Sequence, residues 1–137
     1  MDIEYSLDDL ESVSQKILKY AKSDVFLCFG EMSVGKTTLI KTLVKALGSD
    51  DNVSSPTYSL VNEYLAEGKK IYHFDFYRIN SIEEVYDMGF EDYLSQDAFI
   101  IIEWPELIEP LWPEQFVRVD LSLSVNDKRK LTLSEVG

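Results

Sequence analysis

Residues 25–37, which read VFLCFGEMSVGKT, decide the fold. Val25 to Phe29 is an apolar run that ends at a glycine, a pattern typical of a strand buried on both faces of a parallel sheet. After Gly35, apolar residues recur every three or four positions as far as Leu47, which predicts a helix ending near Gly48. The stretch therefore predicts a buried strand, a tight turn and an amphipathic helix.

The turn itself, Gly30 to Thr37, fits the pattern G-x-x-x-x-G-K-[ST] of phosphate-binding loops. In such a loop, consecutive backbone N–H groups surround a phosphate and the helix N-terminus adds positive potential. Gly35 allows close approach of the backbone, Lys36 reaches the outer phosphates, and the Thr37 hydroxyl binds Mg²⁺. An ordinary glycine turn with a surface lysine is the alternative. The flanking strand and helix favour the phosphate loop, with Lys36 as a catalytic residue.

A phosphate loop needs an acidic partner for its metal ion, and Glu103 is the first candidate. It directly follows the apolar run Ala98 to Ile102, which predicts a second strand buried on both faces. In a parallel sheet, the end of this strand would bring Glu103 beside Thr37, where Walker-B-type carboxylates lie. We therefore predict Thr37 and Glu103 as Mg²⁺ ligands. The alternative for Glu103 is a solvated acid at a strand end.

The second acidic candidate, Asp75, lies where aromatic and polar side chains alternate, which predicts a strand over residues 71–77. The polar face of this strand carries His73, Asp75 and Tyr77, and the other face carries Tyr72, Phe74 and Phe76. We predict Asp75 as a catalytic residue that positions the attacking water or holds the metal ion through a water. For His73, a sensing role and a structural role with satisfied hydrogen bonds both stay open.

Two further segments are candidates for nucleotide sensing. Ser55 and Thr57 flank a proline, and their hydroxyls could approach the terminal phosphate, although a plain turn fits the residues equally well. Trp104 follows Glu103 and could report nucleotide binding, whereas core packing is the ordinary role of such an indole.

The remaining patterns place these motifs in one domain, residues 1–137. Ser6 and Asp9 resemble a capping box ahead of an amphipathic helix. An extended segment, Tyr58 to Leu65, precedes a turn at Glu67-Gly68-Lys69, and the alternating tail predicts a closing hairpin. Strands that alternate with helices indicate an α/β sandwich.

Composition limits the possible functions. The chain has 137 residues, 45% of them hydrophobic, which is enough for one domain with its own core. Its 13 basic and 25 acidic residues give a net charge of −12, which opposes direct binding to nucleic acid or to anionic membranes. The single cysteine, Cys28, excludes an internal disulfide and a multi-cysteine zinc site. Because the amino terminus is acidic and no apolar run approaches the length of a membrane span, we expect a cytoplasmic protein.

Five segments, in this order, resemble the bacterial TsaE family: GEMSVGKTT, SSPTYSLVNEY, HFDFYR, EEVYDMGFEDYL and IIEWPE. Members of that family are small P-loop ATPases required for the threonylcarbamoyl modification of adenosine 37 in tRNA. The resemblance implies a P-loop NTPase-like three-layer sandwich, with a mainly parallel sheet and an antiparallel hairpin portion. It also implies nucleotide binding by Gly30, Met32, Ser33, Val34, Gly35, Lys36, Thr37 and Thr38.

Residue roles follow from the same resemblance. Glu103 matches the acid implicated in Mg²⁺ binding, Asp75 matches the acid implicated in catalysis, and Ser55 and Thr57 match a switch-like segment. Ser33 stands where the family usually has a glycine.

Partners are implied in the same way. ATP hydrolysis with Mg²⁺ would drive a conformational or product-release cycle of the TsaB–TsaD complex, in which TsaD carries the transfer chemistry. Contact with tRNA would run through these partners, in agreement with the net charge.

Three rival functions use the same loop. A small-molecule kinase is the main alternative, but the chain has only three arginines and no insertion long enough to form a lid. A GTP switch is disfavoured because no N-K-x-D motif is present, so we expect ATP rather than GTP. A binding module without catalysis is disfavoured by the intact Lys36, Thr37 and Glu103.

Overall fold

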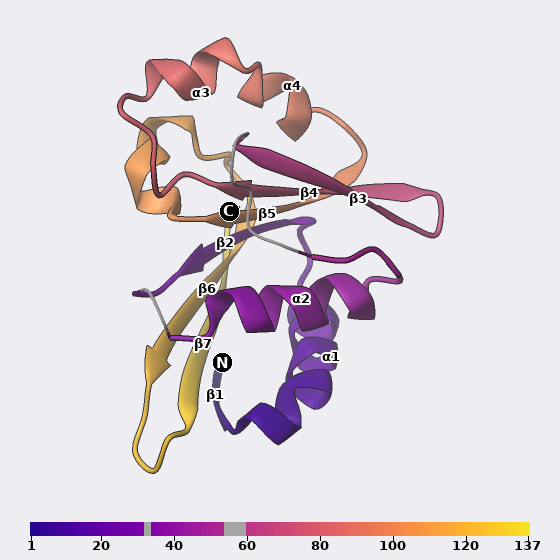
Figure 1. Cartoon of the computed structure of the whole chain (residues 1–137), viewed down its shortest axis with the longest axis vertical. Coiled ribbons are helices and arrows are strands. Elements are labelled where there is room, and N and C mark those ends of the chain that lie inside the picture. The colour runs from indigo at the N-terminus through magenta and orange to yellow at the C-terminus, as the bar shows by residue number, and fades with distance from the viewer. Residues whose placement is uncertain (32–33, 54–59) are drawn as a thin grey trace.

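The structure, a computed structural model, describes residues 1–31, 34–53 and 60–137 (Figure 1). Seven strands within these residues form one sheet, in the order β1-β7-β6-β2-β5-β4-β3. The strands are β1 (Asp2–Tyr5), β2 (Val25–Phe29), β3 (Val61–Ala66), β4 (Lys69–Asp75), β5 (Ala98–Glu103), β6 (Phe116–Leu123) and β7 (Arg129–Val136). The helices are α1 (Leu10–Tyr20), α2 (Lys36–Ala46), α3 (Glu83–Asp87) and α4 (Phe90–Leu94), with the 3₁₀ segments η1 (Leu7–Asp9) and η2 (Pro105–Leu111).

The middle of the sheet is parallel. Strand β2 pairs in parallel with β5 and β6, and β5 pairs in parallel with β4. Antiparallel pairing is confined to the two edges, where β3 joins β4 and where β7 joins β6 and β1. Figure 1 shows α1 and α2 on one face of the sheet and α3 and α4 on the other. The chain therefore has the predicted three-layer α/β sandwich with an antiparallel hairpin portion, and its sheet is mixed: the three central pairings are parallel and the three outer pairings are antiparallel.

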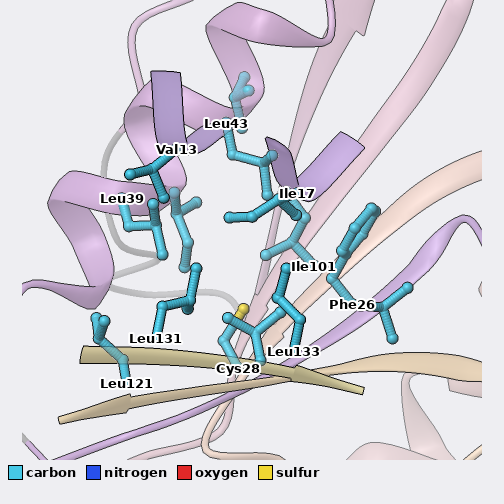
Figure 2. Close-up of a cluster of buried hydrophobic side chains, with 14 of the residues drawn as sticks. Val13, Ile17, Phe26, Cys28, Leu39, Leu43, Ile101, Leu121, Leu131 and Leu133 are labelled. Atoms are coloured by element: carbon cyan, nitrogen blue, oxygen red, sulfur yellow. The ribbon is translucent and has the colours of Figure 1, made fainter. Parts of the chain in front are cut away.

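Each face of the sheet has its own hydrophobic core. On β2, Phe26 and Cys28 belong to the core formed with α1 and α2, whereas Leu27 belongs to the core on the opposite face. Figure 2 shows side chains such as Ile17 of α1 and Leu43 of α2 packed above Cys28 and the β7 side chains. Because alternate residues of a strand point to opposite faces, a strand between two cores must be apolar throughout. This explains why β2 and β5 could be predicted from their apolar runs alone.

The first helical segment begins as its capping pattern predicts, and a similar contact precedes α3. The backbone N–H and the hydroxyl of Ser6 donate to the Asp9 carboxylate at 3.0 and 3.1 Å, which caps η1 and leads into α1. The side chain of Glu84 in α3 accepts the backbone N–H groups of Asn80 and Ser81 in the same way. No helix among the described residues combines the length and the apolar character that a membrane crossing requires.

The structure differs from the sequence predictions in three places. Strand β1 was not predicted, because its four residues, Asp2–Tyr5, are too few to show a pattern and form only by pairing with β7. The turn before β4 contains Glu67 and Gly68 only, both with positive φ, as in a two-residue hairpin loop. Lys69, placed in this turn by the sequence, is the first residue of β4 and pairs with Ala66. The predicted strand over residues 71–77 also ends earlier, at Asp75.

The buried thiol of Cys28 gives a direct test of this packing. Its side chain is 4% exposed, and burial raises the pKa of the thiol to about 12. A thiol in such a position stays protonated and sterically protected. We therefore expect native protein to give no reaction with Ellman's reagent at mildly alkaline pH, whereas protein in guanidinium chloride should release one equivalent of chromophore. Reaction of the native protein at the rate of the unfolded chain would contradict the two-sided burial of β2.

Candidate nucleotide-binding site

The carboxyl ends of β2, β4 and β5 meet at a cavity of about 390 Å³ beside the N-terminus of α2. This volume lies in the usual range of small-molecule sites, and the ends of parallel strands are where such sites form in α/β folds. Seven predicted site residues line the cavity: Gly35, Lys36, Thr37, Thr38, Asp75, Glu103 and Trp104. The fold thus brings together three segments that are far apart in the sequence.

Backbone geometry at the two loop glycines explains how the chain passes from β2 into α2. Gly30 has a φ of 152°, and a Cβ built on it would lie 2.7 Å from the backbone oxygen of Leu121 in β6. Gly35 has a φ of 100° at the N-cap of α2. Side chains are disfavoured at both positions, because of the clash at Gly30 and the left-handed backbone at Gly35. The side chain of Val34, between them, is buried in the core beneath the loop.

Lys36 is the most unusual side chain of the site. Its side chain is 7% exposed, and no described residue accepts a hydrogen bond from its Nζ atom. The ammonium lies 4.0 Å from the centre of the Trp104 ring, a cation–π contact. Burial lowers the pKa of Lys36, and the nearby Glu103 carboxylate opposes this shift. A buried cation without hydrogen bonds costs free energy, which a bound anion would recover.

Glu103, at the end of β5, is buried, and a hydrogen bond with His73 fixes its carboxylate. Its Oε2 atom lies 2.7 Å from Nε2 of His73, and Nδ1 of the same ring lies 3.3 Å from the Tyr64 hydroxyl. When Glu103 is ionised, Nε2–H of a neutral His73 donates to it and Nδ1 accepts the Tyr64 hydroxyl proton. His73 is fully buried and is not among the residues that line the cavity. Its satisfied hydrogen bonds agree with the structural role left open by the sequence.

Asp75 lies next to Glu103 on the neighbouring strand. The two residues are register partners in the parallel pairing of β4 with β5, and both line the cavity. Burial raises the pKa of Asp75, while a hydrogen bond of 3.0 Å from the Tyr77 backbone N–H to Oδ1 acts in the opposite direction. Two adjacent carboxylates in a partly buried site favour a cation between or beside them.

These oxygen atoms fit a magnesium ion better than they fit a transition metal. Among the described residues, no group of three or more histidine, cysteine, aspartate or glutamate side chains is arranged to enclose a metal ion. Mg²⁺ does not need such an enclosure, because it commonly binds one or two protein oxygens and takes its other ligands from water and phosphate. Thr37, Glu103 and Asp75 could supply that small number of oxygens at this cavity.

Trp104, which follows Glu103, lines the cavity and contacts Lys36. Its φ of 57° is rare for a bulky residue and places it in the left-handed region, directly before Pro105. The indole packs on Tyr77 with ring centres 4.9 Å apart, contacts the Lys36 ammonium, and also packs against the core on the α3 and α4 side of the sheet. With this backbone conformation the aromatic ring lies against the cation of the phosphate loop.

Four predicted residues lie outside the described part of the chain: Met32, Ser33, Ser55 and Thr57. Their assignment to nucleotide binding and sensing stays a prediction from sequence.

Sequence reasoning missed four residues of the site: Leu7, Glu31 and Arg129, which line the cavity, and Tyr64, which lies behind Glu103. Arg129, the first residue of β7, lines the cavity and donates from Nε to the Val34 carbonyl at 2.8 Å. Tyr64 of β3 extends the hydrogen-bond chain behind Glu103. The sequence showed only an arginine in a hairpin and a tyrosine in a strand. Neither pattern indicates which strands become neighbours of the phosphate loop.

The fold and this cavity together define a P-loop-like α/β protein. Solved structures agree with that class: the crystal structure of YdiB from Bacillus subtilis superposes with a TM-score of 0.73 and covers 100% of this chain and 87% of the other. At 23% sequence identity this similarity describes the fold alone.

Sequence comparison then identifies the family. The family model for "Threonylcarbamoyl adenosine biosynthesis protein TsaE" matches residues 5–131, so the chain belongs to the TsaE family. The TsaE protein of Haemophilus influenzae is 41% identical over 76% of this chain and 65% of its own length. The corresponding protein of Rickettsia typhi is 36% identical over 82% of this chain and 78% of its own length. The TsaE protein of Bacillus subtilis is 29% identical over 95% of this chain and 82% of its own length.

Proposed function

We propose that this chain is a Mg²⁺-dependent ATPase that serves the threonylcarbamoyl modification of adenosine 37 in tRNA by acting on the TsaB–TsaD complex. One observation carries the proposal of nucleotide binding: the buried Lys36 ammonium, without a hydrogen-bond partner in the described residues, at a cavity entered by the N-terminus of α2. A triphosphate would supply the missing anion. The names of the family and of its relatives support the place in tRNA modification.

Each residue has a distinct task in the proposed reaction. Lys36 would bind the outer phosphates, and Thr37 with Glu103 would hold Mg²⁺, whose positive charge would stabilise the phosphate oxygens. Asp75 orients a water whose oxygen attacks the γ-phosphorus. The bond from that phosphorus to the bridging oxygen breaks, the electron pair stays on the ADP oxygen, and inorganic phosphate leaves with the water oxygen and one of its protons, while the other proton passes to solvent.

The hydrogen-bond chain behind Glu103 fits this division of tasks. Because His73 donates to one carboxylate oxygen of Glu103, that oxygen is fixed and the other is available to the metal ion. Asp75 lacks such a contact with His73 and instead accepts the Tyr77 backbone N–H. The more rigid carboxylate is therefore assigned to the metal and the more exposed one to water.

Charge supports the proposal that partners carry the RNA. With a net charge of −12, the chain repels a phosphate backbone, so a direct tRNA complex would need a basic surface from elsewhere. A role as the ATP-driven subunit of the TsaB–TsaD complex provides that surface.

The test is ATP hydrolysis measured for the chain alone, with TsaB–TsaD, and with TsaB–TsaD plus tRNA. We expect slow, Mg²⁺-dependent release of inorganic phosphate by the chain alone and a large stimulation by the partners, as for P-loop switches completed in trans. Lys36→Ala in the same mixtures is the control for contaminating ATPases. Absence of phosphate release in every mixture would reject the ATPase. Phosphate transferred to an added metabolite would favour the kinase, and hydrolysis indifferent to TsaB–TsaD would reject the partnership.

A further inference from the structure

Arg129 reaches the phosphate loop from a part of the chain that no phosphate-loop motif includes. It is the first residue of β7, and it is paired on both sides, with Tyr5 of β1 and with Leu123 of β6. Its backbone is therefore fixed in the sheet rather than carried by the hairpin loop. A side chain anchored in this way can hold a neighbouring loop at a defined distance.

The guanidinium joins two carbonyl groups. Its Nε atom donates to the carbonyl oxygen of Val34 at 2.8 Å, and its Nη1 atom donates to the carbonyl oxygen of Asp127 at 2.9 Å. A Cβ built on Gly35 would lie 3.5 Å from the same Nε atom, so the side chain also packs against the N-cap of α2. The planar fork of arginine makes this double contact in a single geometry.

The bond to Val34 has a consequence for the donors of the loop. The carbonyl of Val34 and the N–H of Gly35 belong to one peptide group, and in a planar trans peptide they point in opposite directions. When Arg129 holds the carbonyl on its own side, the Gly35 N–H is turned away from the guanidinium. Arg129 thus sets the orientation of one of the backbone donors with which phosphate loops bind anions.

The positive charge of Arg129 is a second reason to expect that this residue contributes to phosphate binding. The cavity is lined by three carboxylates, those of Glu31, Asp75 and Glu103, and by two cations, those of Lys36 and Arg129. Phosphates are strongly anionic, so a cavity with this many carboxylates needs every fixed positive charge near the loop. Without Arg129, Lys36 would be the only cation lining it among the described residues.

We propose that Arg129 is a positioning residue for the phosphate tail: it braces the peptide between Val34 and Gly35 and adds a fixed positive charge beside it. This inference rests on the proposed nucleotide binding. It assigns the C-terminal hairpin a part in ligand affinity, and it predicts an effect on the phosphates rather than on the nucleobase.

The test compares Arg129→Gln with Arg118→Gln by isothermal titration calorimetry, with Mg²⁺ and with ATP, ADP or inorganic tripolyphosphate. Arg118 is a matched control, because it lies on the adjacent strand β6, pairs with Asp120 and is not among the residues that line the cavity. Both substitutions change the net charge by the same amount. We expect Arg129→Gln to weaken all three ligands by roughly tenfold or more, as for loss of a charged hydrogen bond, and Arg118→Gln to bind as the wild type.

Circular dichroism and the melting temperature show whether each variant is folded, and Arg129→Lys is the second variant. Lysine keeps the charge without the rigid fork, so we expect it to bind more weakly than the wild type and more tightly than Arg129→Gln. If Arg129→Gln does not fold and Arg129→Lys does, the affinity of Arg129→Lys relative to the wild type tests the inference. Wild-type affinity in either folded Arg129 variant would overturn the inference. So would a loss confined to ATP and ADP with tripolyphosphate unaffected, since Arg129 would then act on the adenosine. Absence of ATP binding by the wild-type chain would instead reject the proposed function.

Discussion

The Lys36→Ala variant should lose ATP binding almost completely, with a dissociation constant raised by roughly two orders of magnitude or more. Lys36 is the buried cation of the cavity and the one whose Nζ atom has no hydrogen-bond partner among the described residues. Its contacts with two phosphate groups would be charge-assisted, and each such hydrogen bond contributes about 1.5–3 kcal/mol. Since about 1.4 kcal/mol corresponds to a factor of ten in affinity, two lost contacts account for the expected change.

The same substitution should not destabilise the protein without ligand. In that state the ammonium is buried without a hydrogen bond, which costs free energy. The contact with Trp104 recovers only part of this cost, because cation–π contacts contribute about 0.5–2 kcal/mol. We therefore expect the melting temperature of Lys36→Ala without ligand to equal or exceed that of the wild type. Loss of binding without loss of stability would show that Lys36 serves ligand binding. A structural lysine would instead lower the melting temperature when removed.

Calorimetry with Mg²⁺ and ATP measures the affinity, and Lys41→Ala is the matched control on the same helix. Lys41 is exposed and does not line the cavity, so its removal should leave binding unchanged. Fluorescence of Trp104 gives a second measure, because phosphate bound to Lys36 changes the charge 4.0 Å from the indole ring. Wild-type affinity in Lys36→Ala would remove the basis for the proposed function.

The fold could be predicted where burial imposes a pattern on the sequence. Strands β2 and β5 lie between two cores, so every residue of each must be apolar until the strand ends at the site. The same logic brought Glu103 to the cavity, because the carboxyl ends of neighbouring parallel strands share one edge of the sheet. Edge strand β1 has no such constraint, and its pairing with β7 depends on residues more than a hundred positions away.

The site was predictable to the extent that it is local. The phosphate loop is a continuous segment with its own motif, and Lys36 and Thr37 follow from it. Arg129 and Tyr64 act at the site only because of strand order, since their hairpins join the sheet where β6 lies beside β2 and β4 beside β5. Periodicity predicts which residues form a strand but carries no information on which strands become neighbours. Contacts made across the sheet by single side chains therefore had to come from the structure.

Asp75→Asn should retain ATP binding and lower the turnover number by roughly two orders of magnitude or more, the usual contribution of a group that positions or deprotonates the attacking water. Asparagine keeps an oxygen that can accept the Tyr77 backbone N–H, so the local backbone should be unchanged. Burial already disfavours the charged form of Asp75, so the neutral side chain should not destabilise the protein.

Glu103→Gln tests the other carboxylate and serves as the contrast. Glutamine can still accept the hydrogen bond from His73, but it is a weaker ligand for Mg²⁺. We expect this variant to need a higher Mg²⁺ concentration for half-maximal hydrolysis, whereas Asp75→Asn should keep the Mg²⁺ dependence of the wild type. Titrations of ATP and of Mg²⁺, combined with phosphate release at saturation, separate the two effects.

Because the two side chains are neighbours in register and differ mainly in their support by His73, an exchange of the two phenotypes would mean that their roles are reversed. Wild-type turnover in Asp75→Asn together with unchanged Mg²⁺ dependence in Glu103→Gln would exclude both carboxylates from the reaction.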